Sequence, residues 1–288
     1  MIGDTVYLNG HYLPVGEAKI SPLDRGFLFG DGVYEVIPVY SRRPFRGDEH
    51  LTRLQQSLAG IRLTDPLGTD AWRAIVARLV SAAAWEDQGV YLQVTRGADN
   101  KRDHAFPTAP VPPTVFAMTA PLVTPSAAVR AKGVAAITAE DNRWLRCNLK
   151  TTALLANVLL RQQAADAACA ETLLIRDGWL TEGSTTNVLI VRDGTLIAPP
   201  KSHLILPGVT YDVVLELAAQ HGLLHAIRPV SADELRAADE VWITSSTKEI
   251  LAVTTLDGCP IGDGAPGPIS HRMWQWYQDF KNTVMRHG

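Results

Sequence analysis

The sequence has few of the features that mark specialised classes of protein. Its 288 residues include three cysteines, Cys147, Cys169 and Cys259, which is an odd number without the spacing of metal ligands. No apolar run is long enough to cross a bilayer, and the first residues lack a basic segment followed by an apolar one. We therefore expect reduced cysteines, no membrane partner and a cytoplasmic location.

Charge and glycine patterns exclude further classes. The 27 lysines and arginines against 30 acidic residues give a net charge of -3, without a basic block, so nucleic acid is not an expected partner. Neither a Walker loop nor a glycine-rich dinucleotide fingerprint is present. His221 and His225 could share a helical face as metal ligands, but Gly222 between them is typical of a helix end. No metal is predicted.

What is present indicates a globular protein of one large domain or two. The composition is 46% hydrophobic and 20% charged, which is ordinary for a globule of this size. Prolines recur between positions 107 and 125 and disfavour helix there. We place a linker at residues 121–127, between a small N-terminal domain of residues 1–120 and a larger C-terminal domain of residues 128–288.

Local patterns alternate between strand and helix. Residues 6–13 predict a hairpin around Asn9-Gly10, and two Arg-Asp-Gly turns predict paired strands between residues 172 and 198. Apolar residues at helical spacing predict helices at 49–58, 69–85 and 211–220. Residues rich in β-branched and aromatic types predict further strands at 33–40, 90–95, 114–119, 134–138 and 240–243.

One lysine stands at the start of a largely apolar run. Lys150 is followed by residues 151–165, which contain no acidic side chain. Desolvation there would favour the neutral amine that a Schiff-base nucleophile needs. An equally plain interpretation is a lysine that lies along a helix and extends its ammonium to water. The stretch alone favours this second interpretation, which is the commoner one for such a lysine.

Other polar residues suggest an anion or a buried carboxylate. Arg53 lies next to the apolar stripe of its helix, so its guanidinium could turn inward towards an anion. Glu182 precedes a glycine and the hydroxyl tract 184–186, which suits a buried carboxylate with nearby donors. Residues 206–210 precede a helix and would gather backbone N–H groups, while residues 244–247 form a predicted turn with hydroxyl donors. Each pattern is also typical of an ordinary cap or surface loop.

Seven ordered segments together resemble a known family. They are residues 24–36, 49–54, 94–97 with Arg102 and His104, 143–150, 181–187, 206–213 and 243–250. At these spacings the chain resembles the class IV, fold type IV pyridoxal phosphate aminotransferases, and most of all the D-amino acid aminotransferases among them. The resemblance implies an α/β fold with a smaller N-terminal domain, a larger β-rich C-terminal domain and the cofactor between them.

The resemblance also implies a role for each candidate residue. Lys150 would attach the cofactor aldehyde and carry the proton, and Glu182 would face the pyridine nitrogen. The phosphate would be held by Arg53, Val209, Thr210, Ser245 and Ser246, and Leu206 would pack against the ring. The substrate carboxylate would be bound in a homodimer by Tyr34 of one subunit with Arg102 and His104 of its neighbour. The loop at residues 98–101 is one residue longer than the family pattern, so Lys101 is the alternative to Arg102.

The implied reaction is amino transfer by a ping-pong mechanism from a D-amino acid, such as D-alanine or D-glutamate, to 2-oxoglutarate or pyruvate. Alternatives on the same fold are a branched-chain L-aminotransferase, an (R)-amine transaminase and an aminodeoxychorismate lyase. A non-catalytic dimeric binding protein is the alternative from another class.

Overall fold

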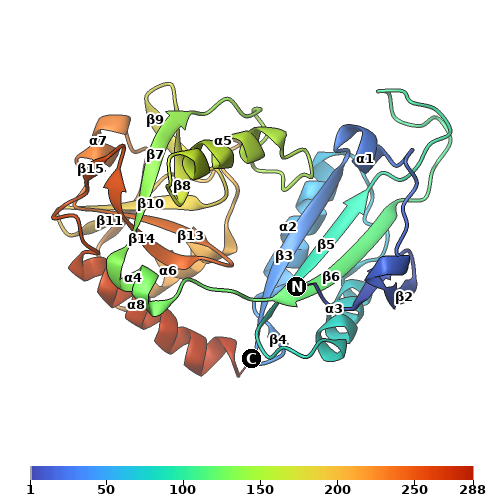
Figure 1. Ribbon diagram of the computed structural model, residues 1–288, viewed down its shortest axis with the longest axis horizontal. Helices are drawn as coiled ribbons and strands as arrows, with labels where there is room; N and C mark the ends of the chain where they lie inside the picture. The colour runs from blue at the N-terminus through green and yellow to red at the C-terminus, as the bar shows by residue number, and fades with distance from the viewer. Residues whose placement is uncertain (1, 288) are drawn as a thin grey trace. The chain divides into compact units, whose positions relative to one another are not determined.

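The computed structural model describes residues 2–287, which form two compact units (Figure 1). The first unit contains residues 2–123, the segment Leu149–Leu154 and residues 284–287. The second unit contains Thr124–Asn148 and Leu155–Thr283. No sequence pattern indicated that residues 149–154 return to the first unit. The linker at residues 121–127 stays a prediction.

The first unit is built on a six-stranded antiparallel sheet in the order β2-β1-β6-β5-β3-β4. The predicted hairpin is confirmed, because Asn9 and Gly10 both have positive φ and join the first two strands. The predicted strands at 33–40, 90–95 and 114–119 are also confirmed. In chain order the six strands are Thr5–Leu8, His11–Pro14, Gly32–Tyr40, Arg43–Pro44, Gln88–Thr95 and Thr114–Pro121.

Helices α2 and α3 cover one face of this sheet. They span Gly47–Gly60 and Thr69–Ala82, and their apolar stripes pack on alternate residues of β3, β5 and β6 to form the core of the unit. The side chain of Glu35 lies on the face of the sheet that α2 covers, where it contacts Arg53. The side chain of Tyr34, one residue earlier in the strand, lies on the opposite face. The remaining helical elements are the turn η1, Val15–Glu17, and the short helix α1, Arg25–Phe29.

The second unit is built on a mixed nine-stranded sheet in the order β12-β11-β10-β13-β14-β7-β8-β9, with β15 beside β14. Strand β9 also contacts β10, so the sheet curls around an apolar interior. The two predicted turns are confirmed, with positive φ at Asp177-Gly178 and Asp193-Gly194. From β7 to β15 the strands are Val134–Glu140, Glu171–Arg176, Trp179–Gly183, Asn187–Arg192, Thr195–Ala198, His225–Ile227, Glu240–Ser245, Glu249–Leu256 and Cys259–Pro260.

Helices pack on the outside of this curled sheet. Helices α6 and α8 lie against β13, and α5 lies against β7 and β8. Helix α6 begins at Val209, two residues before the predicted start, and β13 continues through Thr244 and Ser245, which were predicted to lie in a turn. The helices of this unit are α4 to α8, at Ala127–Lys132, Leu155–Asp166, Val209–Gln220, Ala232–Arg236 and Pro268–Phe280. The element η2, Lys281–Met285, begins in this unit and ends in the first.

Across residues 2–287, no helix combines the length and the apolar character needed to span a membrane.

Candidate active site

Lys150 lies in an irregular segment beside the start of β3. Its backbone N–H donates to Ser57 Oγ at 3.1 Å, and its carbonyl accepts from the Tyr34 N–H at 2.9 Å. Leu149 packs so closely on Gly60 that a Cβ there would lie 2.4 Å from Leu149 Cδ2. The backbone of Lys150 is therefore fixed on both sides. The interpretation of Lys150 as a residue lying along a helix is wrong, since α5 begins only at Leu155.

The amine of Lys150 is placed over an aromatic face. Its Nζ lies 4.2 Å from the centre of the Tyr34 ring, and that ring stacks on Tyr91 with centroids 5.5 Å apart. The lysine side chain is half-buried, and the stacked tyrosines limit the directions it can take. The amine of Lys150 is thus held at a defined point beside the Tyr34 ring.

Arg53 does turn inward, and the anion that it meets is a carboxylate of the same unit. Glu35 receives Arg53 Nη2 at 2.6 Å and Arg53 Nε at 2.9 Å, and His50 Nδ1 lies 3.0 Å from it. Burial alone would raise the pKa of Glu35, but the charge of Arg53 and the hydrogen bonds from Arg53 and His50 hold that pKa far below its usual range. The guanidinium is therefore fixed in orientation by a buried, ionised partner.

His50 completes this cluster as a neutral imidazole. Burial is the main cause that lowers the pKa of His50, and it outweighs the attraction of Glu35. The ring then donates from Nδ1 to the carboxylate, while Nε2 is buried without a hydrogen-bond partner among residues 2–287. Neither Glu35 nor His50 was recognised from the sequence, because a single buried carboxylate on a strand leaves no local pattern.

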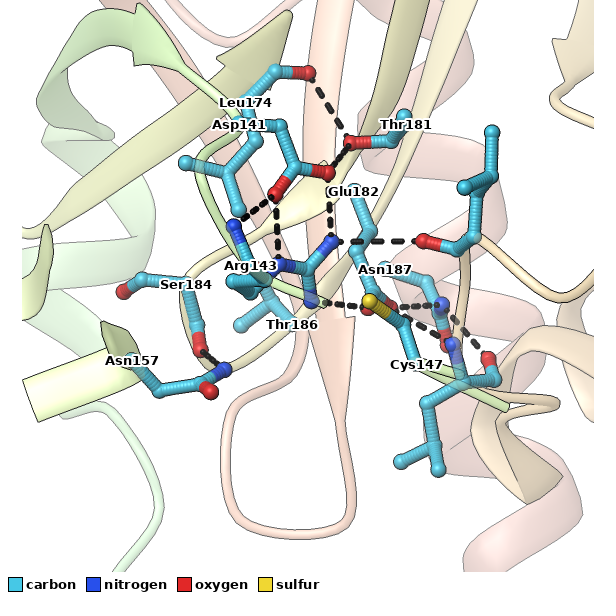
Figure 2. A network of polar contacts seen from close by, with 12 residues as sticks. Asp141, Arg143, Cys147, Asn157, Leu174, Thr181, Glu182, Ser184, Thr186 and Asn187 are labelled. Carbon is cyan, nitrogen blue, oxygen red and sulfur yellow. Dashed lines mark hydrogen bonds and ion pairs between the residues drawn. The ribbon is translucent and has the colours of Figure 1, made fainter. Parts of the chain in front are cut away.

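Glu182 is the centre of the polar network in the second unit (Figure 2). Its side chain accepts from Arg143 Nη1 at 2.5 Å, from the Leu206 N–H at 3.0 Å and from Asn187 Nδ2 at 3.1 Å. Burial raises the pKa of Glu182 to about 7, although Arg143 and the Leu206 N–H act in the opposite direction. A carboxyl poised near neutrality can exchange or share a proton with a ligand.

Arg143 is fixed by a second carboxylate. Its Nε and Nη2 donate to the two oxygens of Asp141, each at 2.9 Å, and Thr181 Oγ1 donates to the same Asp141 at 2.9 Å. Burial opposes the charge on Arg143, but Asp141 and Glu182 raise its pKa, so the guanidinium stays charged. The sequence signal for this pair is an acid two residues before an arginine, which is too common to be specific.

Asn187 connects Glu182 to the start of helix α6. Its Nδ2 also donates to the Leu206 carbonyl at 2.9 Å, and a Cβ on Gly208 would lie 2.0 Å from its Oδ1. Gly208 caps the helix without a side-chain hydrogen bond, and the buried Val209 and Thr210 form the first turn. This start of α6 therefore presents backbone N–H donors next to Leu206.

Strand pairing places the end of β13 beside Asn187. Thr244 is its register partner, and Thr244 Oγ1 is buried without a hydrogen-bond partner among the described residues. Ser245 follows, with an Oγ that accepts from the Lys248 N–H at 3.1 Å, and Ser246 is half-buried in the turn beyond. Asn187 thus has Thr244 beside it in the sheet and Leu206 and Gly208, just before α6, next to its side-chain amide.

The hydroxyl groups of residues 184–186 donate hydrogen bonds to Glu171 and not to Glu182. The hydroxyls of Ser184, Thr185 and Thr186 all donate to the buried carboxylate of Glu171 on β8. Lys248 Nζ lies 3.6 Å from the same carboxylate. The expectation of nearby donors for Glu182 was therefore wrong in detail: its donors come from positions 143, 187 and 206.

Arg102 and His104 lie together on an exposed loop of the first unit. The Arg102 Cζ and the His104 ring centre are each 5.1 Å from the centre of the Phe29 ring. No contact joins either residue to Tyr34 within residues 2–287 of one chain. Lys101, the alternative, is exposed and pairs with Asp103, with Nζ to Oδ2 at 3.4 Å.

Each unit offers reactive or ligand-binding groups of its own. The first unit has the amine of Lys150 beside Tyr34. The second unit has the buried carboxyl of Glu182 and, at the start of α6, backbone N–H donors that suit an anion such as a phosphate. Within residues 2–287, no group of three or more histidine, cysteine, aspartate or glutamate side chains is arranged to hold a metal ion.

Comparison with known proteins finds curated relatives that match most of the chain. The chain is 42% identical to the D-alanine aminotransferase of Bacillus licheniformis over 265 residues, which cover 92% of this chain and 93% of that protein. It is 35% identical to the D-alanine aminotransferase of Staphylococcus aureus (strain MW2), covering 96% of this chain and 98% of that protein.

The structure is also similar to a solved aminotransferase. The branched-chain amino acid aminotransferase of T.th. with pyridoxamine 5'-phosphate superposes with a TM-score of 0.87 at 27% identity, over 96% of this chain and 93% of that one. The sequence profile of the amino-transferase class IV family matches residues 32–256. With this match over most of its length, the chain belongs to the class IV aminotransferases.

Proposed function

We propose that this class IV aminotransferase transfers the amino group of a D-amino acid, such as D-alanine or D-glutamate, to a 2-oxo acid such as 2-oxoglutarate or pyruvate. The supporting relatives are D-alanine aminotransferases that match 92% and 96% of the chain. The single observation that carries the chemistry is the buried Glu182, whose carboxyl is held by Arg143 and titrates near neutrality. The two half-reactions follow one another in a ping-pong order.

The cofactor is pyridoxal 5'-phosphate, which supplies an aldehyde and an electron-accepting ring. Lys150 is assigned to hold it covalently, and Glu182 to hold the proton on the ring nitrogen. Leu206 is assigned to the face of the ring. The phosphate is assigned to Arg53, Val209, Thr210, Ser245 and Ser246, whose guanidinium, N–H and hydroxyl groups are suitable donors.

Arg143 and Asp141 give Glu182 a fixed direction. A lone carboxyl in an apolar site would rotate and stay protonated, whereas the Arg143 Nη1 bond favours the ionised form and sets the angle of the group. A positively charged N–H placed against Glu182 would lower its pKa from the raised value of about 7, so that the carboxylate persists through the reaction.

Lys150 is assigned to move the proton of the substrate α-carbon. Its backbone is fixed by Ser57 and Tyr34, so only the side chain has to swing. The Tyr34 ring keeps the amine near one position at 4.2 Å and shields part of it from water. An amine that starts close to its working position loses little entropy when it reacts.

The substrate carboxylate is assigned to Tyr34 together with Arg102 and His104 of the partner subunit. Support comes from the exposed position of both loop residues and from the lack of a contact to Tyr34 within residues 2–287 of one chain. Helix α5 also exposes Leu155, Val158 and Leu159 along one side, as an interface would require. A homodimer is therefore part of the proposal, and the mass of the protein in solution, measured by light scattering, tests it. The proposed location is the cytoplasm.

The test of the reaction is a half-reaction screen on the purified holoenzyme. Each amino donor is added without an oxo acid, and the cofactor absorption is followed. D-Alanine and D-glutamate are expected to convert the spectrum, while L-leucine and (R)-1-phenylethylamine leave it nearly unchanged. No response to any D-amino acid would refute the proposed substrate class.

A branched-chain L-aminotransferase is the second candidate, because the T.th. enzyme shares the fold with a TM-score of 0.87. Its identity of 27% is lower than the 42% to the D-alanine aminotransferase, which favours the D-amino acid reaction. A spectrum converted by L-leucine and not by D-alanine would reverse this preference.

A further inference from the structure

Arg25, at the start of α1, binds the backbone of the loop that carries Arg102 and His104. Its Nη1 donates to the Asp103 carbonyl at 2.6 Å and to the Ala105 carbonyl at 3.2 Å, and its Nη2 donates to the His104 carbonyl at 3.2 Å. The side chain is buried, with 4% of its area exposed. One guanidinium thus satisfies three successive carbonyls of an otherwise exposed loop.

The guanidinium of Arg25 is itself fixed by Asp31. Arg25 Nε donates to Asp31 Oδ2 at 2.8 Å, and the same carboxylate receives Arg96 Nε at 2.8 Å and Arg96 Nη2 at 3.0 Å. Arg96 also donates to the Ile61 carbonyl at 2.7 Å, just after α2 ends. Arg25, Asp31 and Arg96 therefore connect the loop to the end of α2.

Phe29, one turn further along α1, contacts the side chains of the loop. The centre of its ring is 4.8 Å from Arg25 Cζ and 5.1 Å from both Arg102 Cζ and the His104 ring centre. The backbone of α1 is anchored in turn, since the Arg25 N–H donates to the Gly97 carbonyl at 2.9 Å. Helix α1 thus holds the loop in two ways. Arg25 binds the loop carbonyls, and Phe29 contacts the side chains of Arg102 and His104.

We propose that Arg25, together with Phe29, is a positioning residue for recognition of the substrate carboxylate. This inference rests on the proposed function, in which Arg102 and His104 bind that carboxylate. Arg25 does not touch the substrate. It keeps the two donors in one arrangement before the substrate arrives, so that binding does not have to order a mobile loop.

The test is Arg25→Lys, with Arg42→Lys as the matched control. Lysine keeps the charge beside Asp31, but its single ammonium cannot serve three carbonyls and a carboxylate at once. Arg42 pairs with Glu86 far from the loop in the fold of the first unit. In the holoenzyme, Arg25→Lys is expected to raise KM for D-alanine about tenfold, with kcat changed less than threefold and the cofactor spectrum unchanged. Arg42→Lys is expected to change neither.

A double-mutant cycle separates positioning from a structural role. In the background Arg102→Ala with His104→Ala, the Arg25→Lys change is expected to have no further effect on KM. A tenfold effect that persists in that background, or an Arg25→Lys enzyme with KM within twofold of the parent, would overturn the inference. If Arg25→Lys does not fold, the same KM measurements and the same cycle are made with Phe29→Leu. This variant keeps the bonds from Arg25 to the loop carbonyls but loses the ring that contacts Arg102 and His104.

Failure of the proposed function is seen separately. If the parent enzyme does not react with D-alanine, the proposed substrate class is refuted, and the cycle is repeated with the amino acid that does convert the cofactor spectrum. A rise in its KM that depends on Arg102 and His104 supports the positioning role, and an unchanged KM overturns it.

Discussion

The titration of Glu182 is expected to make the cofactor-free protein less stable as the pH rises. Burial raises the pKa of this carboxyl from 4.5 to about 7 in the folded chain. Between these values the folded state keeps a proton that the unfolded state has released. The unfolded state then binds fewer protons than the folded state, so the free energy of unfolding falls with increasing pH.

The size of the effect follows from the two pKa values. A shift of one pKa unit corresponds to about 1.4 kcal/mol, so titration from pH 5 to pH 8 removes roughly 2 to 3 kcal/mol. Other groups titrate over the same range, and a comparison with Glu182→Gln isolates this one. The amide has a similar size and keeps an oxygen acceptor for Arg143, whose charge stays balanced by Asp141.

The assay is thermal unfolding of both cofactor-free proteins at about pH 5, 6, 7 and 8, at one protein concentration. The difference in Tm is expected to move in favour of the Gln variant by roughly 5 °C across this range, since 1 kcal/mol shifts Tm by about 2 °C in a chain of this size. A constant difference would refute the raised pKa. A shift in favour of the parent would show that Arg143 lowers the pKa of Glu182 below its usual value.

Three further substitutions test the assigned site. Lys150→Ala is expected to abolish turnover in steady-state assays while leaving the fold unchanged by circular dichroism, because one amine serves as both nucleophile and proton carrier; normal turnover would refute the assignment. Arg102→Ala is expected to cost ~2 to 4 kcal/mol in kcat/KM for D-alanine, since the carboxylate loses a paired donor; an unchanged value would make Lys101 the next residue to replace. Gly208→Ala is expected to weaken cofactor retention on dialysis at least tenfold, because a Cβ would lie 2.0 Å from Asn187 Oδ1; unaltered retention would show that the start of α6 is not a phosphate site.

Local signals predicted the elements well because the relevant forces are local. The Asn9-Gly10 and Asp177-Gly178 turns need positive φ, which these residues accept at little cost. The helix around Arg53 was recognisable from apolar spacing, and its inward guanidinium followed from the same pattern. These features depend on the next few residues and not on the rest of the chain.

Features that depend on distant partners were not predictable in the same way. The hydroxyls after Glu182 donate to Glu171, which lies on a neighbouring strand. No pattern around either glutamate shows which of the two carboxylates accepts these hydrogen bonds. Glu35 is recognisable as a partner of Arg53 only once β3 and α2 are packed together. The sequence resemblance identified the assigned site residues, but it did not identify the groups that orient them.

The interleaving of the two units has a consequence for synthesis of the chain. The first unit needs Leu149, which fills the space beside Gly60, and Arg286, whose Nη2 pairs with Asp87 at 2.5 Å. On the ribosome the sheet of this unit can form early, but its edge beside β3 stays bare until Leu149–Leu154 has emerged. The nascent first unit therefore remains incomplete until residue 286 leaves the exit tunnel. A fragment that ends at Val123 is expected to bind chaperones and to give little folded protein when it is expressed alone.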